Sequence, residues 1–324
     1  MSTIKEVAKL AGVGLGTASR ALNGGKNVSP ETMEKVLEVS RKLQYKPNKT
    51  ARSLVKGDYS QPTIGVIFTT AIHPFFYEIL RGIYYGLQQS HYNLLVFNMG
   101  YDRGNVFNRI PFENLAGILN VSTKMTAEEK KQLKISRIPF VYLDYFEEDV
   151  NSIYLDNYMG GGMAGAYLLS KGLQKIAFVG ENTHNQQSER RVSGFMDKLK
   201  EQNIEPVCQK LIDIQEEMPF DIYEKESYYL TKEILQNHEI DGIFFYCDEF
   251  AYGGLNAVEE LGGPVSIIGY DDTMPSKYLK LTTIRQPAYK LGLEGARQMI
   301  NLILGADNKI WQKCIHPELI VRST

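Results

Sequence analysis

Two short helical patterns separated by a tight break at residues 11–13 constrain the fold of this chain more than any other feature. In the first pattern, apolar residues recur at the spacing of one helix face, namely at Ile4, Val7, Ala8 and Ala11. In the second, Ala18, Ala21 and Leu22 supply the buried face. Two short helices joined by a glycine-containing turn are typical of a helix-turn-helix, whose second helix can enter the DNA major groove. A small helical hairpin without a partner is the alternative.

The 324 residues divide into a basic head and an acidic body. Residues 1–60 hold 11 Lys and Arg against 5 Asp and Glu, a net charge of +6. Residues 61–324 hold 25 against 33, a net charge of −8. A basic head on a larger acidic body is expected of a protein whose head meets phosphate groups, although a solvated basic face would look the same.

A third helix is predicted after the first two, because Ser29 can cap it and Pro30 suits its first turn. Its inner stripe consists of Met33, Val36, Leu37, Ser40 and Leu43. The helix should end before Pro47, since the residue that precedes a proline disfavours helical backbone. Three short helices make a very small core, so contact with DNA or a partner should help to order the head.

A hinge is predicted to follow the head. Residues 48–55 can form two helical turns capped by Asn48, but a helix of this length is unstable alone in water and needs a partner. We therefore expect a head over residues 1–46, a hinge helix with a linker over 47–61, and a body over 62–324.

Cysteine and histidine usage predicts neither disulfides nor a metal site. The cysteines are far apart and show no CxxC spacing; they are Cys208, Cys247 and Cys314. The five histidines never fall at metal-ligand spacing. The N-terminus lacks a cationic-then-apolar signal pattern, and no run approaches 18 apolar residues. We therefore expect a soluble protein of the reducing cytoplasm.

From residue 63 onward, strand-like runs alternate with amphipathic helical patterns. The expected strands are 64–68, 93–97, 117–121, 140–144, 152–156, 175–180, 242–248 and 266–272. The expected helices include 77–90, 160–171, 188–201, 223–237 and 250–261. Near-continuous apolar strands between helices indicate parallel sheets covered on both faces. So many units exceed one doubly wound sheet, and we predict two α/β subdomains with a ligand cleft between their strand ends.

One glycine motif competes with this interpretation. Residues 160–165 fit the GxGxxG pattern of dinucleotide-binding loops. Such a loop places its glycines directly after a strand and an acidic residue about 20 positions later. Here Asp156 and Asn157 intervene, and Asn157 can cap a helix, so we expect the glycines inside a helix where they allow close packing. No GxxxxGK[ST], HExxH or GxSxG occurs and no spacing suggests a triad, so we expect no cofactor and no enzyme.

Several further segments occur in a fixed order along the whole chain. They are PN..ARSL at 47–54, HPFF at 73–76, LDN at 155–157, RRVSGF at 190–195, IIGYDD at 267–272, LTTIRQP at 281–287 and PELIVRST at 317–324. With the helix-turn-helix stretch, these segments resemble the LacI/GalR (lactose/galactose repressor) family of bacterial transcription regulators. The resemblance implies a body like that of periplasmic binding proteins, with an N-subdomain over about 62–158 and 288–315 and a C-subdomain over about 159–287 and 316–324.

The resemblance further implies a homodimer that binds a near-palindromic operator. Its base-reading positions are Leu15, Gly16 and Arg20. Its phosphate-contacting positions are Thr3, Thr17, Ser19, Asn23, Asn27, Ser29 and Thr32. The hinge begins at Tyr45 and Asn48, and its minor-groove face holds Ala51 and Leu54. Arginine can read guanine through two hydrogen bonds, hydroxyl and amide groups grip phosphate, and a leucine wedge can kink the duplex.

The recognition helix departs from the family pattern at two glycines. Gly14 stands where a serine usually caps this helix, which removes a hydroxyl cap although glycine is tolerated there. Gly16 offers no side chain to a base, and Leu15 offers only apolar contact. We therefore expect direct readout to rest mostly on Arg20 and on DNA shape.

For the body, the resemblance implies a small-molecule effector in the cleft. The matching positions are Phe75, Phe76, Asp144, Arg191, Cys247 or Asp248, and Asp271. An aromatic wall with carboxylates and an arginine suits a polyhydroxylated ligand, a sugar being the expected class. The family often has asparagine in place of Cys247. Phe75 and Phe76 could instead belong to a helix-capping core, and Asp271 with Asp272 could form a plain turn.

Other classes of protein make different demands on the sequence. A transport-type sugar-binding protein shares the body's architecture but should carry a secretion signal, an enzyme should present a nucleophile or base, and a nucleoid-type structural protein should lack an effector response. The expected mechanism is a dimer, formed through the N-subdomains, in which effector binding changes the distance between the two hinges. No leucine heptad follows residue 321, so a helical tetramer bundle is not expected.

Overall fold

The protein is described here by a computed structural model covering residues 4–22, 28–43, 62–68, 73–182, 185–213, 220–305 and 309–324. The chain divides into two compact units, Met1–Ser60 and Gln61–Thr324. The predicted hinge lies outside the described residues, as do the predicted DNA-contacting residues Thr3, Asn23, Asn27, Tyr45, Asn48, Ala51 and Leu54. Among the helices in these ranges, none combines the length and apolar character needed to cross a membrane.

The head contains the predicted pair of helices, α1 (Ile4–Ala11) and α2 (Leu15–Leu22), followed by α3 (Pro30–Lys42). Gly12 forms the break with a φ of +66°, a conformation that glycine adopts without strain. The small apolar faces pack together in one buried cluster, which consists of Val7, Ala8, Ala11, Ala18, Ala21 and Val36. The predicted cap of α3 is confirmed, because the N–H of Thr32 donates to Ser29 Oγ at 3.3 Å.

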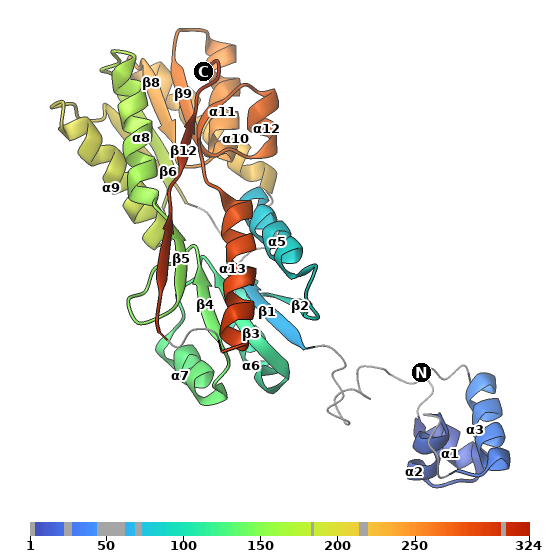
Figure 1. The fold of residues 1–324 in the computed structure, drawn as a ribbon. Helices are drawn as coiled ribbons and strands as arrows, with labels where there is room; N and C mark the ends of the chain where they lie inside the picture. The colour runs from blue at the N-terminus through green and yellow to red at the C-terminus, as the bar shows by residue number, and fades with distance from the viewer. Residues whose placement is uncertain are drawn as a thin grey trace. The chain divides into compact units, whose positions relative to one another are not determined.

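The body is built on two six-stranded sheets, each between layers of helices (Figure 1). The first sheet has the order β11-β5-β4-β3-β1-β2 and all its strands are parallel. These strands are β1 (Thr63–Phe68), β2 (Asn93–Asn98), β3 (Leu115–Val121), β4 (Phe140–Leu143), β5 (Ser152–Leu155) and β11 (Gln312–Ile315). In its centre, Val66 of β1 lies between Val96 and Leu119.

The second sheet has the order β12-β10-β9-β8-β6-β7, with only β12 running antiparallel to its neighbour among these strands. They are β6 (Ile176–Glu181), β7 (Cys208–Ile212), β8 (Gly242–Phe245), β9 (Ser266–Asp271), β10 (Thr282–Arg285) and β12 (Glu318–Ile320). Consecutive residues of a strand serve opposite faces. Phe244 packs in one buried cluster and Phe245 in the other, as expected for a sheet covered on both sides.

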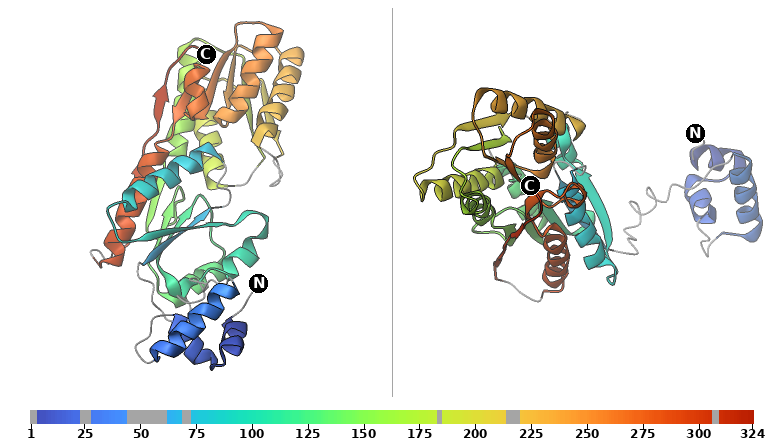
Figure 2. Two further views of the ribbon diagram at one scale, coloured as in Figure 1. Left: turned by 90° about the vertical axis from the view of Figure 1, so that its right-hand side faces the viewer. Right: turned by 90° about the horizontal axis from the view of Figure 1, so that it is seen from above.

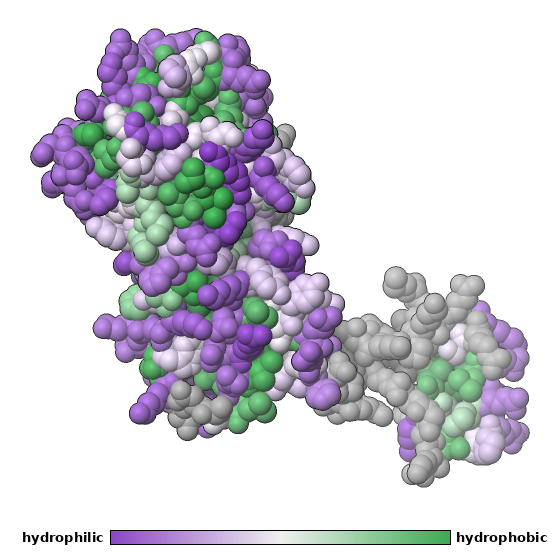
Figure 3. Space-filling model, turned by 45° about the horizontal axis from the view of Figure 1, so that its top comes forward, coloured by the Kyte–Doolittle hydropathy of each residue, from purple (hydrophilic) through white to green (hydrophobic). Residues whose placement is uncertain are grey.

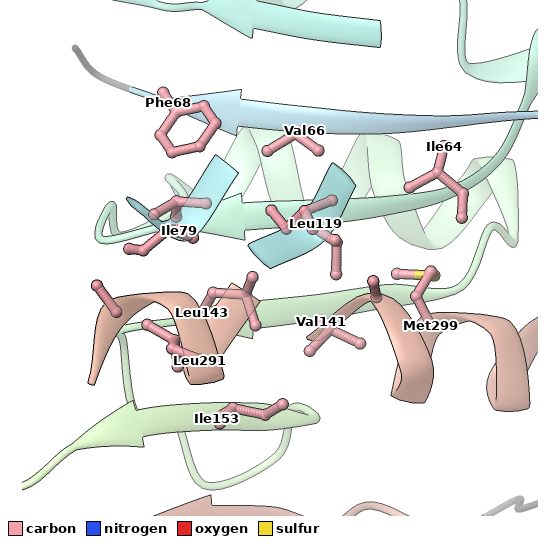
Figure 4. Packing of buried hydrophobic residues seen from close by; sticks show 14 of the residues in the cluster. Ile64, Val66, Phe68, Ile79, Leu119, Val141, Leu143, Ile153, Leu291 and Met299 are labelled. Atoms are coloured by element: carbon pink, nitrogen blue, oxygen red, sulfur yellow. The ribbon is translucent and has the colours of Figure 1, made fainter. Parts of the chain in front are cut away.

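Helices α5 (Pro74–Leu87) and α13 (Ala288–Ile303) lie side by side on one face of the first sheet, as both views of Figure 2 show. Figure 4 shows Ile64, Val66 and Phe68 pointing from β1 toward Ile79 of α5 and Leu291 of α13. The opposite face is covered by α6 (Arg103–Asn108) and α7 (Ala127–Ser136). Two 3₁₀ turns, Gly100–Asp102 and Phe112–Asn114, flank α6.

The second sheet carries α8 (Asn157–Ser170) and α9 (Gln186–Lys200) on one face. On the other face lie α10 (Phe220–Asn237) and α11 (Asp248–Leu261), and the short α12 (Met274–Tyr278) follows β9. All eight expected strands and all five expected body helices coincide with observed elements, with boundaries shifted by a few residues. The expected segments omitted helices α6, α7, α12 and α13 and strands β7, β10, β11 and β12.

The chain crosses between the two sheets at three places within the described residues. These are the links from β5 to α8, from β10 to α13 and from β11 to β12. Two of the crossings are joined directly, because the N–H of Asp156 donates to the carbonyl of Ile315 at 3.1 Å. The crossings hold the carboxyl ends of both sets of parallel strands toward each other.

Helices α8 and α9 approach closely at the glycines of the GxGxxG stretch. A Cβ added to Gly161 would lie 1.8 Å from the carbonyl oxygen of Arg191, and one added to Gly194 would lie 1.9 Å from that of Tyr158. Both clashes are with backbone, which cannot move aside cheaply. At Gly162 the nearest atom would be 3.6 Å away, an ordinary contact. The glycines therefore allow helix packing, as the sequence predicts.

We expect Gly161→Ala to lower the free energy of unfolding by several kcal/mol or to prevent folding, because α8 and α9 must separate. Gly162→Ala is the matched control. It should leave stability unchanged or raise it by up to about 1 kcal/mol, since alanine favours a helix more than glycine does. Urea unfolding followed by circular dichroism, with soluble yield recorded, checks both. Equal stability of the two variants would contradict this packing.

Candidate functional site

The ends of the parallel strands form a cleft between the two sheets. Ser122 follows β3, Asp144 follows β4 and Asp271 ends β9. Their φ angles are +56°, +55° and +114°, which place three non-glycine residues in the left-handed half of backbone space. Such strain is uncommon and clusters at functional sites. Here it turns the chain sharply at the strand ends.

The cleft has a volume of about 240 Å³ and is polar with an aromatic wall. Its lining residues are His73, Phe75, Phe76, Ser122, Asp144, Glu181, Asn185, Gln187, Arg191, Tyr223, Tyr246, Cys247, Asp271 and Gln286. Six of the seven residues expected to contact an effector are among them. The proposed contacts thus converge on one cavity, although they come from segments far apart in the sequence.

Asp144 is a buried carboxyl at the floor of the cleft. Its Oδ2 accepts a hydrogen bond from Ser122 Oγ at 2.7 Å, and its Oδ1 accepts none from the described residues. Burial raises the pKa of Asp144 to about 7, although the hydrogen bond from Ser122 and the charge of Arg191 oppose the shift. This carboxyl is therefore well placed to accept a hydrogen bond from a ligand.

Asp271 is a second buried carboxyl, on the opposite side of the cleft. Gln286 Nε2 donates to its Oδ1, while Gln286 Oε1 has no partner among the described residues. Burial raises the pKa of Asp271 to about 6, against the opposing charge of Arg191. The left-handed backbone favours the plain-turn interpretation for Asp272, whose carboxylate binds Arg285 and Arg322.

Arg191 of α9 is a buried cation fixed between aromatic rings. Its Nε and Nη2 donate to Asn157 Oδ1 at 3.3 and 2.9 Å, and its Nη1 donates to the carbonyl of Tyr246 at 2.5 Å. The guanidinium carbon lies 3.6 Å from the ring centre of Tyr270 and 4.5 Å from that of Tyr246. Cation–π contacts of this kind help to offset the desolvation of the charge.

The aromatic wall comes from the start of α5 and from the second sheet. Phe75 is buried and belongs to the core beneath α5 while also lining the cleft, so its place in the core is compatible with the predicted ligand contact. Phe76 is half-buried and packs edge-on against Phe68 and Phe75. Such rings offer a flat apolar face to a ligand.

His73 joins the two sides of the cleft. Its Nδ1 accepts the N–H of Phe75 at 3.2 Å and so caps α5, and its Nε2 lies 3.3 Å from the carboxylate of Glu249 on α11. The neighbouring Cys247 is buried, and burial raises the pKa of its thiol well above the ordinary value. Cys247 therefore lines the cleft as a thiol and does not act as a thiolate.

Asp248 is the exception among the expected effector contacts. It is fully buried and does not line the cleft. Its carboxylate accepts hydrogen bonds from Ser276 Oγ, Thr283 Oγ1 and the N–H of Thr273. These three hydrogen bonds hold α11 against β10 and the loop after β9, and Asp248 is therefore not among the effector contacts that we propose.

Sequence reasoning missed eight of the fourteen residues that line the cleft. The residues that no motif singled out are His73, Ser122, Glu181, Asn185, Gln187, Tyr223, Tyr246 and Gln286. The HPFF and LTTIRQP segments contain His73 and Gln286, which is the one signal that points to them. Asn157 also differs from its expected role. Asp156 caps α8 by accepting the N–H of Met159, whereas Asn157 begins the helix and holds Arg191.

The second helix of the head exposes few side chains that can contact a base. Leu15 is 47% exposed, and a Cβ at Gly14 or Gly16 would meet no atom within 4 Å. Arg20 is exposed and its Nε donates to the carbonyl of Gly16 at 3.2 Å. Thr17, Ser19 and Thr32 are half-buried, and Ser29 is exposed. The Ser29 hydroxyl also donates to Thr32 Oγ1 at 2.8 Å.

Both parts of the chain match known families. Residues 3–48 match "Bacterial regulatory proteins, lacI family", and residues 166–324 match "Periplasmic binding protein-like domain". The HTH-type transcriptional repressor PurR of Mannheimia succiniciproducens is 30% identical, with 100% of this chain and 98% of the relative covered. The chain belongs to the LacI family. It is therefore a DNA-binding transcriptional regulator, with a helix-turn-helix head and a periplasmic-binding-protein-like body.

One further relative is named after a sugar, and a similar solved structure contains one. The ribose operon repressor of Haemophilus influenzae is 27% identical, with 100% of this chain and 98% of the relative covered. A LacI family transcriptional regulator from Enterococcus faecium, solved with bound ribose, is 26% identical with a TM-score of 0.70. That match covers 80% of this chain and 97% of the solved one. This LacI family regulator is thus similar to relatives over the body as well as the head.

We expect Asp144→Asn to stabilise the body at pH 8 but hardly at pH 4. The pKa of Asp144 rises from 3.8 to about 7 on folding, so the free energy of unfolding falls as the pH rises through this window. The neutral amide removes that loss, which we put at about 1–3 kcal/mol. Urea unfolding of the two proteins at both pH values measures it. The control variant Asp102→Asn, at an exposed site, should leave the free energy of unfolding unchanged at both pH values. A stabilisation equal at pH 4 and pH 8 would contradict the ionisation of Asp144.

Proposed function

We propose that this LacI family regulator is a repressor that binds a near-palindromic operator as a homodimer, and that an uncharged sugar bound in the cleft controls its operator affinity. The observation that carries the proposal is the cleft itself. It combines a fixed guanidinium, buried carboxyls and aromatic rings within one cavity. The ribose in the name of one relative and in the structure of another supports the sugar class.

The charges of the cleft favour a neutral ligand over an anion. Asp144, Glu181 and Asp271 line it, and Glu249 lies behind His73, whose pKa it raises to about 9 against the effect of burial. Four acidic groups thus face two cations, Arg191 and His73. Arg191 already donates three hydrogen bonds to protein oxygens. A phosphate would add negative charge beside buried carboxyls, which costs free energy in a medium of low dielectric.

The unpaired acceptors favour a ligand rich in hydroxyl groups. Asp144 Oδ1 and Gln286 Oε1 accept no hydrogen bond from the described residues. A buried polar atom without a partner is costly, and a hydroxyl donor would remove that cost. The remaining N–H groups of Arg191 can donate to ring or hydroxyl oxygens, while Phe75, Phe76 and Tyr246 cover the apolar face of the sugar.

In the head, we propose that Arg20 reads a base, that Leu15 makes an apolar base contact and that Gly16 lets the helix approach the groove. We assign phosphate contacts to Thr17, Ser19, Ser29 and Thr32, and to the remaining predicted positions. With so few side chains at the base-reading positions, DNA shape should supply part of the specificity.

We assign the dimer interface to one side of the body, where α5 and β2 of the predicted N-subdomain lie in Figure 1, and extend it to α12 of the predicted C-subdomain on the same side. Figure 3 shows hydrophobic patches interrupting a largely hydrophilic surface on the face it presents. Exposed large hydrophobic residues of α5, β2 and α12 are Tyr77, Tyr84, Tyr85, Leu95, Val96, Met274 and Tyr278. A groove of about 790 Å³ runs between α5, α12 and the start of α13. Exposed apolar surface of this extent is typical of an interface.

Effector and operator act on one equilibrium in this proposal. A ligand that contacts residues of both sheets changes the relative populations of two body arrangements, and these set the distance between the hinges of a dimer. The coupling must be reciprocal, so operator binding changes effector affinity by the same factor. The proposed boundaries follow, with a head over 1–46, a hinge over 47–61, and two subdomains that meet near residues 158, 287 and 315.

The same proposal places the protein in the cytoplasm, where its operator is, and makes it a binding protein without enzymatic activity. The cleft thiol of Cys247 has a raised pKa, so it is a poor nucleophile. His73 uses one ring nitrogen to cap α5 and the other to face Glu249. A catalytic base would need one of these nitrogens for substrate.

We expect Arg20→Ala to lower the preference for operator over scrambled DNA by about 10- to 100-fold, because one base-reading side chain is lost. The operator would first be selected from random duplexes. Lys42→Ala is the charge-matched control, since Lys42 is exposed at the end of α3 and pairs with Glu38. It should weaken binding to both DNAs equally. Unchanged preference in Arg20→Ala would show that the base is read elsewhere.

Calorimetric titration of the purified chain with neutral sugars, the corresponding sugar phosphates, and nucleosides tests the effector class. We expect one neutral sugar to bind and its phosphate to bind at least 10-fold more weakly, because of the buried carboxyls. Asp144→Asn should weaken that binding and Asp102→Asn should not. Tighter binding of a phosphate or a nucleoside would overturn the neutral-sugar proposal, and a bound sugar without effect on operator affinity would overturn the control of DNA binding.

A further inference from the structure

Three potential metal ligands meet where the chain crosses between the two sheets. Asp156 lies in the crossing from β5 to α8, while Cys314 is in β11 and His316 follows it in the crossing to β12. One ligand atom from each residue lies within 4.8 Å of the other two, and Asp156 Oδ2 is 3.9 Å from His316 Nδ1. We propose that these residues form a binding site for a divalent transition-metal ion of the zinc type.

The ligand set suits such an ion. Thiolate, imidazole and carboxylate are the three side-chain types that bind zinc, and three protein ligands leave a fourth tetrahedral position for water. Around a tetrahedral zinc, neighbouring ligand atoms lie about 3.3–3.8 Å apart, as follows from the metal–ligand distances. The Asp156–His316 separation of 3.9 Å is just above this range, and the other two separations are within 4.8 Å. The side chain of His316 is 66% exposed, so it can rotate to close the gap.

The ligands are oriented by further hydrogen bonds, as metal ligands usually are. Oδ1 of Asp156 accepts the N–H of Met159 at 3.0 Å, which leaves Oδ2 for the ion. The hydroxyl of Tyr154 interacts with the sulfur of Cys314 and lowers the pKa of the thiol against the effect of burial. The backbone bond from Asp156 to Ile315 holds the two crossings together at 3.1 Å. The site is therefore largely formed by contacts that serve the fold.

Binding the ion replaces the thiol proton of Cys314, which passes to solvent as the sulfur–metal bond forms. Burial raises the pKa of the Cys314 thiol, and the charge of Asp156 adds to the shift, whereas Tyr154 and Arg190 oppose it. The bound ion would tie the β5–α8 crossing to the β11–β12 crossing. Rotation of the two halves of the body must change at least one of these crossings, so the ion would stabilise one arrangement over another. This inference does not depend on which effector the cleft binds.

Cobalt titration of the reduced, full-length chain without an affinity tag tests the site. Cobalt(II) bound to a thiolate gives a charge-transfer absorption band in the near ultraviolet. Trp311 is the chain's one tryptophan and precedes Cys314 by three residues in the same strand segment, at a distance of about 10 Å. We expect the band to saturate at one cobalt per chain, with quenching of the tryptophan fluorescence, and zinc to reverse both.

Variants distinguish the site from chance binding to a thiol. Cys314→Ser should abolish the band. His316→Ala and Asp156→Asn should weaken cobalt binding by at least 10-fold, and asparagine can still cap α8. Cys208→Ala and His91→Ala are controls on a distant thiol and a distant histidine, and should bind as the parent does.

The result that overturns the proposal is equally definite. It is the absence of a thiolate band, a band that survives Cys314→Ser, or affinity that is unchanged in both His316→Ala and Asp156→Asn.

Discussion

The buried guanidinium of Arg191 is the interaction on which the cleft depends. Removing a full charge from water is costly, and the cost is offset only where hydrogen bonds and compensating charge are in place. Asn157 at the start of α8 and the carbonyl of Tyr246 after β8 accept its hydrogen bonds, the ring of Tyr270 in β9 makes a cation–π contact, and Asp271 lies near enough to interact with its charge. One side chain thus fixes the relative positions of three elements, and the close α8–α9 contact at Gly161 brings its own helix near enough to do so.

The two buried carboxyls of the cleft lower the stability of the fold. Asp144 and Asp271 are both buried with raised pKa values, and both have a positive φ at a strand end. Each of these features costs free energy that a hydrophobic residue in a relaxed conformation would not. A protein that keeps them gains acceptors held in fixed positions before a ligand arrives, and such preorganisation lowers the cost of binding.

Much of this architecture could be predicted from the sequence, because central parallel strands are buried on both faces and appear as continuous apolar runs. Strand β7 could not, since it lies at a sheet edge and Gln209 and Leu211 face solvent. Helix α13 was missed because its buried face includes two glycines, which weaken the hydrophobic pattern. Gly292 allows close packing against α5, and Gly295 lies against Leu143 of β4. The cleft could be assembled only through resemblance to a family, since no spacing connects Gln187 on α9 with Asp144 after β4.

The β5–α8 crossing serves both the cleft and the proposed metal site. Asp156 and Asn157 are adjacent, yet Asp156 caps α8 and faces Cys314 and His316, whereas Asn157 holds Arg191 in the cleft. A ligand that draws on Arg191 therefore acts on the first residue of α8, next to the carboxylate proposed to bind metal. Hinges are usually a few residues at the ends of elements, and changes in their backbone are amplified by rigid packing on either side. A ligand that displaces the guanidinium would therefore displace Asn157, and Asn157 is joined by one peptide bond to Asp156, where two of the crossings between the sheets meet.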